Sequence, residues 1–280
     1  MSELKVIKIE LNNHGKPIAS IQGTTSYYGI SPNDTFYPQE EADKVIAEKD
    51  AEIAELQKQV MNERIVVTIA SWPPRIKYVA DCVKSLLDQS RRPDSIEVNL
   101  SRVEFPNGLH DLPDDLLALI ADKSVTINWE EGNTQVFRKE VPVVKKYYGT
   151  DTIMLSCDDD VRYGHGFVER IVNNLGDFEA YNDEPGVVGF KQAVRLKRYT
   201  PDFWEKLTPE VIKAGISDTW HFYYLQSIKA RCKWGPRDTE LCDMCKCVAG
   251  NVSPNSARIG GYNMETMTRA DRLTREALGL

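Results

Sequence analysis

The sequence lacks any long apolar run. None of its 280 residues belongs to a stretch of 18 consecutive apolar residues, so we expect no transmembrane helix. The opening residues, Met1-Ser2-Glu3-Leu4-Lys5, also lack the apolar core of a secretory signal. These two absences predict a cytoplasmic protein, in which the six cysteines are reduced.

The sequence also lacks a polybasic arm or stripe. The formal net charge is -7, and residues 39–63 carry -5 of it, with eight acidic and three basic residues. The rest of the chain is therefore close to neutral. Tight, non-specific binding to nucleic acid relies on many Lys and Arg side chains against phosphates, so it is not expected here. A hydrophobic content of 41% is ordinary for a soluble globular protein.

Two segments precede the main part of the chain. Residues 1–38 predict a small β segment, because the alternating stretches 5–9 and 17–21 flank an Asn-Asn-His-Gly sequence typical of a hairpin turn. Residues 39–62 predict a helix with a heptad seam that has one polar interruption, at Lys49. This helix is either a short coiled coil that forms a homo-oligomer or docks a partner, or a solvated helix lying on the domain.

Strands alternate with helices from residue 63 onward. Strands are predicted at residues 65–70, 95–100, 125–129, 151–157 and 187–190, and helices at 78–87, 112–121, 135–148 and 166–175. This alternation predicts an α/β domain over residues 63–280, with a mostly parallel sheet and helices on both faces. Ligands of such sheets bind beyond the carboxyl ends of the strands. Ser71, Ser101 and Asp158 each follow a predicted strand, so we expect them to meet at one crevice.

The run Asp158-Asp159-Asp160 is the strongest functional signal in the chain. Three adjacent carboxylates repel one another and cannot be buried unpaired in a core. Where a strand opens into a cleft, a divalent cation can lie between them. Mg²⁺ and Mn²⁺ prefer oxygen ligands and are often held by one or two carboxylates together with substrate phosphates. The run predicts either a site for a phosphate-bearing substrate or an acidic turn after a strand.

Several segments, in order, resemble one enzyme family. Residues 67–76, Val-Thr-Ile-Ala-Ser-Trp-Pro-Pro-Arg-Ile, resemble the opening of bacterial and phage-borne nucleotide-sugar glycosyltransferases with the GT-A fold. The similarity continues through residues 85–94, 100–106, 112–113, 129–130, 137–139, Pro142 and 153–163. The last segment matches the DxD region of that family. The resemblance covers about residues 64–190 and implies a Rossmann-like GT-A fold and a nucleotide-diphosphate sugar donor, expected to be a UDP-sugar.

The resemblance also implies roles for the three acids. Asp160, at the last position of the motif, is expected to ligate a Mn²⁺ or Mg²⁺ ion that bridges the two donor phosphates. Asp158 is expected to contact the ribose or sugar of the donor, or to bind the metal through water. Asp159, in the middle position, is expected at the sugar.

Basic and polar residues elsewhere complete the expected donor site. The loop that contains Ser71 and Arg75 resembles the one that borders the base and ribose; alternatively, Arg75 is a solvent-exposed residue at the start of a helix. Lys139 matches a basic position near the diphosphate; alternatively, it is a solvated lysine on a helix. A cation and nearby bases would stabilise the negative charge that develops on the departing diphosphate.

Inverting members of this family need a carboxylate that removes the proton of the acceptor hydroxyl. Asp218 is the candidate, because it precedes the aromatic segment 220–224 on the expected acceptor side, residues 191–280. Alternatively, Ser217 or Asp218 caps the helix that follows. The rival acids for the base are Asp202, Asp238 and Glu240.

The part of the chain beyond residue 190 departs from the family pattern. Four cysteines lie within sixteen residues and predict either a structural Zn²⁺ site or free thiols; they are Cys232, Cys242, Cys245 and Cys247. A second Cys-x₂-Cys pair, which would strengthen the zinc interpretation, is missing. His165 is either a metal or substrate contact or a histidine at the start of a helix.

These features together predict a metal-dependent glycosyltransferase. Its acceptor is left open among a glycan, a lipid-linked sugar, a protein and a modified nucleic-acid base. A nucleotidyltransferase or phosphohydrolase could use the same acidic run, but it would need further metal-binding acids on neighbouring strands. A non-catalytic binding protein on a decayed transferase fold is the third class, and it requires no carboxylate facing the sugar.

Overall fold

The computed structural model describes the chain in several ranges, which are residues 7–11, 17–21, 44, 46–50, 63–182, 192–235, 245–247 and 264–280. The chain divides into two units, residues 1–62 and residues 63–280. In the first unit, β1 (Ile7–Leu11) pairs with β2 (Pro17–Ile21) in antiparallel register, as the alternating pattern predicts. Residues 44 and 46–50 are helical, within the predicted helix 39–62. Most of the heptad seam lies outside the described residues.

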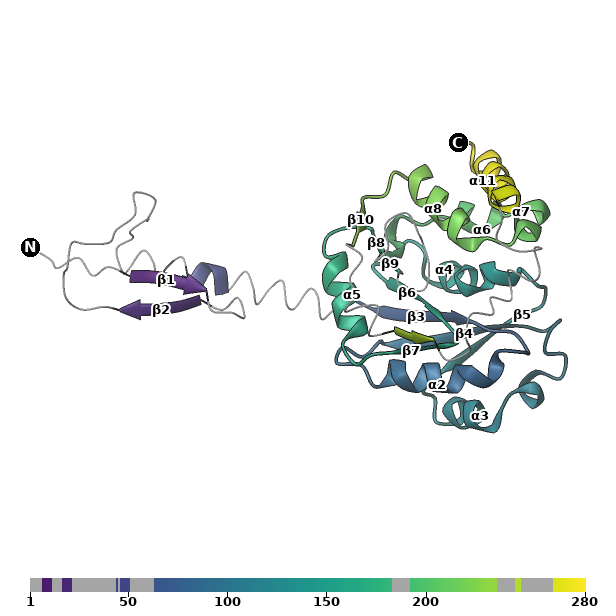
Figure 1. Ribbon diagram of the computed structural model, residues 1–280, viewed down its shortest axis with the longest axis horizontal. Helices are drawn as coiled ribbons and strands as arrows, with labels where there is room; N and C mark the ends of the chain where they lie inside the picture. Colours follow the sequence, from purple (N-terminus) through teal and green to yellow (C-terminus); the bar gives the residue numbers. More distant parts are fainter. Residues whose placement is uncertain are drawn as a thin grey trace, which may run out of the picture. The chain divides into compact units, whose positions relative to one another are not determined.

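A seven-stranded sheet forms the centre of the second unit, in the order β10-β8-β9-β6-β3-β4-β5 (Figure 1). Its strands are β3 (Ile65–Ala70), β4 (Ser95–Ser101), β5 (Thr126–Glu130), β6 (Ile153–Asp158), β8 (Ala180–Asn182), β9 (Gln192–Arg195) and β10 (Cys232–Trp234). Within this sheet, β9 is antiparallel to its neighbours β6 and β8, and the other pairs are parallel. The predicted α/β class with a mostly parallel sheet is confirmed.

Helices cover both faces of this sheet (Figure 1). One core cluster joins the sheet to α2 (Ile76–Leu87), α3 (Asp114–Ala121) and α5 (Phe167–Leu175). The other joins it to α4 (Val141–Tyr147), α6 (Asp202–Glu205), α7 (Pro209–Ala214), α8 (Ser217–Ser227) and α11 (Met264–Leu278). No helix in the described part of the chain is long and apolar enough to cross a membrane.

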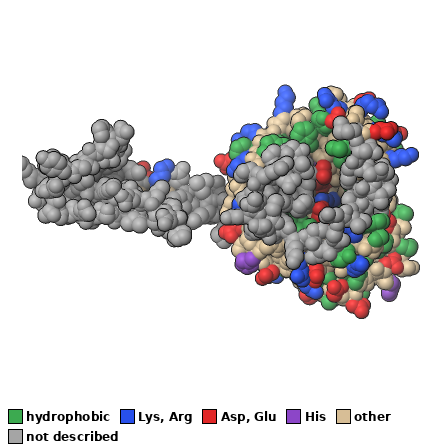
Figure 2. All heavy atoms as spheres, viewed as in Figure 1, with side chains coloured by type: hydrophobic (Ala, Val, Ile, Leu, Met, Phe, Trp, Pro, Cys, Tyr) green, Lys and Arg blue, Asp and Glu red, His purple; other side chains and the backbone are tan. Residues whose placement is uncertain are grey.

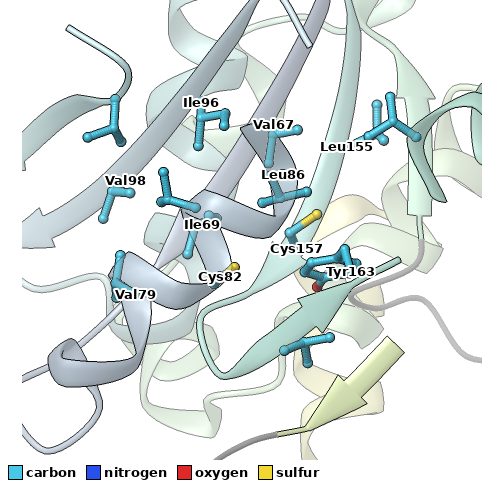
Figure 3. Packing of buried hydrophobic residues seen from close by; sticks show 14 of the residues in the cluster. Val67, Ile69, Val79, Cys82, Leu86, Ile96, Val98, Leu155, Cys157 and Tyr163 are labelled. Atoms are coloured by element: carbon cyan, nitrogen blue, oxygen red, sulfur yellow. The ribbon is translucent and has the colours of Figure 1, made fainter. Parts of the chain in front are cut away.

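The central strands β3 and β6 are buried on both faces, and their side chains alternate between the two cores. Val67 and Leu155 pack with α2 in the first core (Figure 3), whereas Val66 and Met154 belong to the second. Successive side chains of a strand point to opposite faces. Asp158 therefore shares the face of Met154, on which α4 and α8 pack.

The strands and helices predicted over residues 65–175 agree with the structure, except that one predicted helix is divided into two. Pro142 lies in the first turn of α4, so the helix predicted at 135–148 becomes a 3₁₀ helix, η2 (Gln135–Lys139), followed by α4. The strand predicted at 187–190 lies outside the described residues. Five short strands of the described ranges were not predicted: β7, β8, β9, β10 and β11. Of these, β7 (Val161–Tyr163) directly follows the acidic run and pairs in antiparallel register with β11 (Cys245–Cys247).

Candidate active site

The carboxyl ends of β3, β4 and β6 lie next to one another. Ala70, the last residue of β3, is opposite Asn99 of β4 on one side and Asp158 of β6 on the other. The parallel register therefore brings the loop after β3 to the acidic run after β6. The peptide of Asp158 is held in place, because its N–H donates to the Tyr163 hydroxyl at 2.8 Å and its carbonyl accepts from the Cys82 thiol at 3.2 Å.

Asp159 points into the protein. Its carboxylate accepts a hydrogen bond from Ser71 Oγ at 2.6 Å and lies 2.5 Å from the guanidinium of Arg75. The pKa of Asp159 is raised to about 7, mainly by burial and also by the neighbouring charges of Asp158 and Asp160, whereas Arg75 and Ser71 oppose the rise. Asp159 is thus tied to the loop that is predicted to border the nucleotide.

Arg75 stands immediately before α2, and its side chain is only 15% exposed. The same guanidinium nitrogen, Nη2, contacts both Asp159 and Asp160. The side chain is therefore turned onto the acidic run, and the solvent-exposed alternative for this residue is wrong. One basic group lies between two adjacent carboxylates and reduces the repulsion between them.

Lys139 pairs with the remaining acid of the run. Its Nζ lies 2.7 Å from Asp158 Oδ1, and the side chain is 13% exposed, so the solvated-lysine alternative is also wrong. Two neighbouring strands hold its backbone carbonyl, which accepts from the Thr68 hydroxyl and, at 3.2 Å, from Asn99 Nδ2. Burial lowers the pKa of Lys139, but the charges of Asp158 and Asp218 outweigh burial and raise it overall.

Asp218 lies in the first turn of α8, half-buried and close enough to Lys139 and Asp158 for their charges to act on it. Burial raises the pKa of Asp218 to about 7, Asp158 adds to the rise, and Lys139 opposes it. The residue before α8 is Ile216, and no side chain caps the helix. The capping alternative for Ser217 and Asp218 is therefore wrong.

A buried polar cluster that the sequence did not predict lies beside these residues. Glu140 accepts a hydrogen bond from Ser156 Oγ at 2.9 Å and lies 3.0 Å from His221 Nδ1, whose ring also contacts the Tyr199 hydroxyl. Burial raises the pKa of Glu140, but the nearby His221 and Lys139 outweigh burial and lower it overall. Because His221 lies three residues after Asp218, the cluster ties the candidate base to the segment that carries Lys139.

A sequence signal for this polar face exists on β4. Glu97, Asn99 and Ser101 alternate with apolar residues, which on its own suggests a half-exposed strand. All three polar side chains are fully buried instead. The alternation therefore marks a polar interior face rather than a solvent-exposed one.

The rival acids and the histidine take other places. Asp202 is exposed on α6 and pairs with Lys206, whereas Asp238 and Glu240 lie outside the described residues. His165 is exposed, and its Nδ1 lies 2.6 Å from the carbonyl of Asp88, so it does not contact the acids.

The predicted zinc site stays a prediction. Cys232 is half-buried on β10, at the edge of the main sheet. Cys242 lies outside the described residues, and only the backbone of Cys245 and Cys247 is described, in β11.

The acidic run provides the ligand type that a divalent cation prefers. Asp158, with a side chain 36% exposed, and Asp160 could each offer one carboxylate oxygen, and substrate phosphates and water would complete the shell. Within the described ranges, no three His, Cys, Asp or Glu side chains surround a common point. The residues fit Mn²⁺ or Mg²⁺, provided that Arg75 releases Asp160.

No protein-family model matches the chain, and no curated protein matches it. Among solved structures it is similar to S. aureus TarS 1-349 in complex with UDP, at 13% identity and a TM-score of 0.44, over 77% of this chain and 70% of that one. It is also similar to the mannosyltransferase PcManGT from Pyrobaculum calidifontis in complex with GDP-Man and Mn²⁺, at 13% identity and a TM-score of 0.45, over 77% and 72%. A third similarity is to the galactosyltransferase LgtC in complex with donor and acceptor sugar analogs, at 11% identity and a TM-score of 0.37, over 77% and 95%. The chain spans less than half of two other TarS structures that it matches, 47% and 43%.

Proposed function

We propose that this protein is a glycosyltransferase that moves a sugar from a nucleotide-diphosphate donor, expected to be a UDP-sugar, to an acceptor hydroxyl with the help of a divalent cation. One observation carries the proposal. Lys139 pairs with Asp158 at 2.7 Å, and its charge also acts on Asp218. A basic group thus pairs with a half-buried acid at the carboxyl end of β6, with a candidate base close enough for their charges to act on it.

The donor half of the reaction would use the acidic run and Lys139. Breaking the bond between sugar and phosphate leaves a diphosphate with added negative charge. Lys139 already lies at the run with a raised pKa, so it stays protonated and can attract a phosphate oxygen. A Mn²⁺ or Mg²⁺ ion, bound by Asp158 and Asp160, would supply further stabilisation of that charge.

The acceptor half would use Asp218. A general base works best when its pKa lies near the working pH, and burial raises the pKa of Asp218 to about 7. Its ionised form can accept the proton of an acceptor hydroxyl, while the charge of Lys139 limits the cost of ionisation. A binding protein without activity would have no need for an acid with a raised pKa at this point.

The competing phosphoryl chemistry requires acids on neighbouring strands. The buried acid of β4, Glu97, is bonded instead to Lys146 at 2.9 Å and to the Tyr147 hydroxyl at 2.8 Å, on α4. Its carboxylate is therefore engaged away from the acidic run. This arrangement favours sugar transfer over nucleotidyl transfer or phosphate hydrolysis.

The acceptor side is proposed to lie in residues 191–280, and the protein to act in the cytoplasm. The acceptor would be a glycan, a lipid-linked sugar, a protein or a modified base. On the face that Figure 2 shows, acidic and basic side chains are interspersed over the coloured surface, with no stripe of one sign that would suit a nucleic-acid duplex. The heptad helix of residues 39–62 is proposed to form a homo-oligomer.

Titration calorimetry with UDP and with GDP, each with and without Mn²⁺, tests this function. We expect one nucleotide to bind only with Mn²⁺, and Asp160→Asn to abolish that binding. The matched control is Asp151→Asn, because Asp151 is exposed just before the other end of β6 and pairs with the exposed Lys197. Failure of both nucleotides to bind, with any metal, would contradict the proposed donor site.

A further inference from the structure

Arg75 is the counter-ion of two of the three acids in the run. Its Nη2 atom contacts one carboxylate oxygen of Asp159, at 2.5 Å, and one of Asp160. Both acids are buried, at 4% and 6% exposure, so solvent screens these contacts poorly. Two basic groups, Arg75 and Lys139, therefore face the three carboxylates of the run.

A divalent cation and this guanidinium compete for the same oxygen. Cation binding through Asp160 needs an oxygen that Arg75 now contacts, and two positive groups at one carboxylate repel each other. The second oxygen of Asp159 is held by Ser71, so this acid has its own anchor in the loop that carries Arg75. Arg75 can therefore leave Asp160 and stay anchored to Asp159.

The guanidinium is incompletely satisfied where it lies. Arg75 Nε is buried and has no hydrogen-bond partner. A buried donor without a partner is uncommon in proteins and often marks a group that is completed by a ligand. Guanidinium groups bind phosphate oxygens through two parallel N–H groups. A phosphate of the nucleotide-diphosphate sugar is therefore a ligand that could accept a hydrogen bond from Arg75 Nε as well as from a terminal nitrogen.

We infer that Arg75 couples metal binding to donor binding: it holds Asp160 while no metal is bound, yields it to the cation, and then binds a phosphate of the nucleotide-diphosphate donor. This inference rests on the proposed function. Metal alone binds weakly because it must displace Arg75. Donor and metal favour each other because the donor accepts the displaced guanidinium, and such coupling is reciprocal.

The test measures Mn²⁺ affinity without nucleotide, from the electron paramagnetic resonance signal of free Mn²⁺. We expect Arg75→Met to bind Mn²⁺ more tightly than the wild type, by about 5- to 150-fold, the usual range of such couplings. With saturating Mn²⁺, the same variant should bind UDP or GDP, whichever the wild type binds, more weakly by a comparable factor.

Arg162→Met is the matched control. Arg162 lies two residues beyond Asp160, is 58% exposed and pairs with the exposed Asp81, so its loss changes the net charge equally without freeing a carboxylate of the run. Mn²⁺ affinity should stay within about threefold of the wild type, because exposed charges are screened. If Arg75→Met does not fold, Arg75→Lys replaces it, since the lysine side chain is one bond shorter than arginine and its ammonium does not reach the position of Nη2, so Mn²⁺ affinity should also rise.

The inference is wrong if the Arg75 variant that folds leaves Mn²⁺ affinity unchanged or lowers it, or if Arg162→Met raises it as much. Its failure is distinguishable from failure of the proposed function. The Mn²⁺ measurement uses no nucleotide, whereas the proposed function fails when the wild type binds neither UDP nor GDP in the presence of metal.

Discussion

Asp218→Asn should make the protein inactive and, at alkaline pH, more stable. The pKa of Asp218 is raised to about 7 by burial, from an ordinary value of 3.8. The folded protein therefore holds this proton more tightly than the unfolded chain does. Stability associated with the protonated carboxyl is fully present below the unfolded pKa and is lost as pH rises through about 7. The amide side chain of the Asp218→Asn variant does not ionise, so the variant does not lose this stability as pH rises.

The size of the gain follows from that shift. A rise of roughly three pKa units corresponds to at most about 4 kcal/mol, at 1.36 kcal/mol per unit. The side chain is half-buried, and solvent screening reduces the penalty to about 2 kcal/mol over the whole range. For a unit of this size, about 2 kcal/mol raises the melting temperature by roughly 4–8 °C.

The assay is thermal unfolding of wild type and variant at several pH values between about pH 5 and pH 8.5, together with sugar transfer from the donor identified by calorimetry. The stability gain should grow with pH, and transfer should fall by about 10²-fold or more, while donor affinity is retained. Asp202→Asn is the control, because Asp202 is an exposed acid on α6 that pairs with Lys206. It should change neither quantity measurably.

A stability gain that does not change with pH would show that the pKa of Asp218 is not raised. Wild-type activity in Asp218→Asn would refute its role as the base, and attention would then move to Asp238 and Glu240. A loss of donor binding in the same variant would place Asp218 in the donor site rather than on the acceptor side.

Two further predictions concern its neighbours. Lys139→Met should weaken nucleotide binding in calorimetry by about 10-fold or more, because charge-assisted contacts to phosphate are lost, whereas Lys145→Met, on an exposed lysine of α4, should not. Glu140→Gln should lower the free energy of unfolding at neutral pH by about 3 kcal/mol, because it removes a buried carboxylate that Lys139 and Ser156 stabilise. Urea denaturation checks this, with the exposed Glu131→Gln as control. The difference between Glu140→Gln and wild type should shrink below about pH 4.5, where the carboxyl of Glu140, whose pKa is lowered, becomes protonated.

The local sequence was sufficient to predict the central strands and helices. Apolar runs such as 65–70 and 153–157 are strands buried on both faces, and the helix 76–87 shows its apolar face in the spacing of Val79, Val83 and Leu86. These patterns depend only on backbone geometry and on which side chains avoid water. The same reasoning placed the three acids just beyond a strand, at the edge where ligands bind.

Tertiary structure alone decided which charges meet. The sheet order places β6 beside β3, which brings Arg75 to Asp159 and Asp160, and no pattern within either segment encodes that neighbour. Lys139 reaches Asp158 because two strands hold its carbonyl. An ion pair between distant segments depends on the packing of the whole sheet, whereas a strand or helix depends on a few consecutive residues. The resemblance named Arg75 and Lys139 beside the acids, but the sequence did not show which carboxylate each of them contacts.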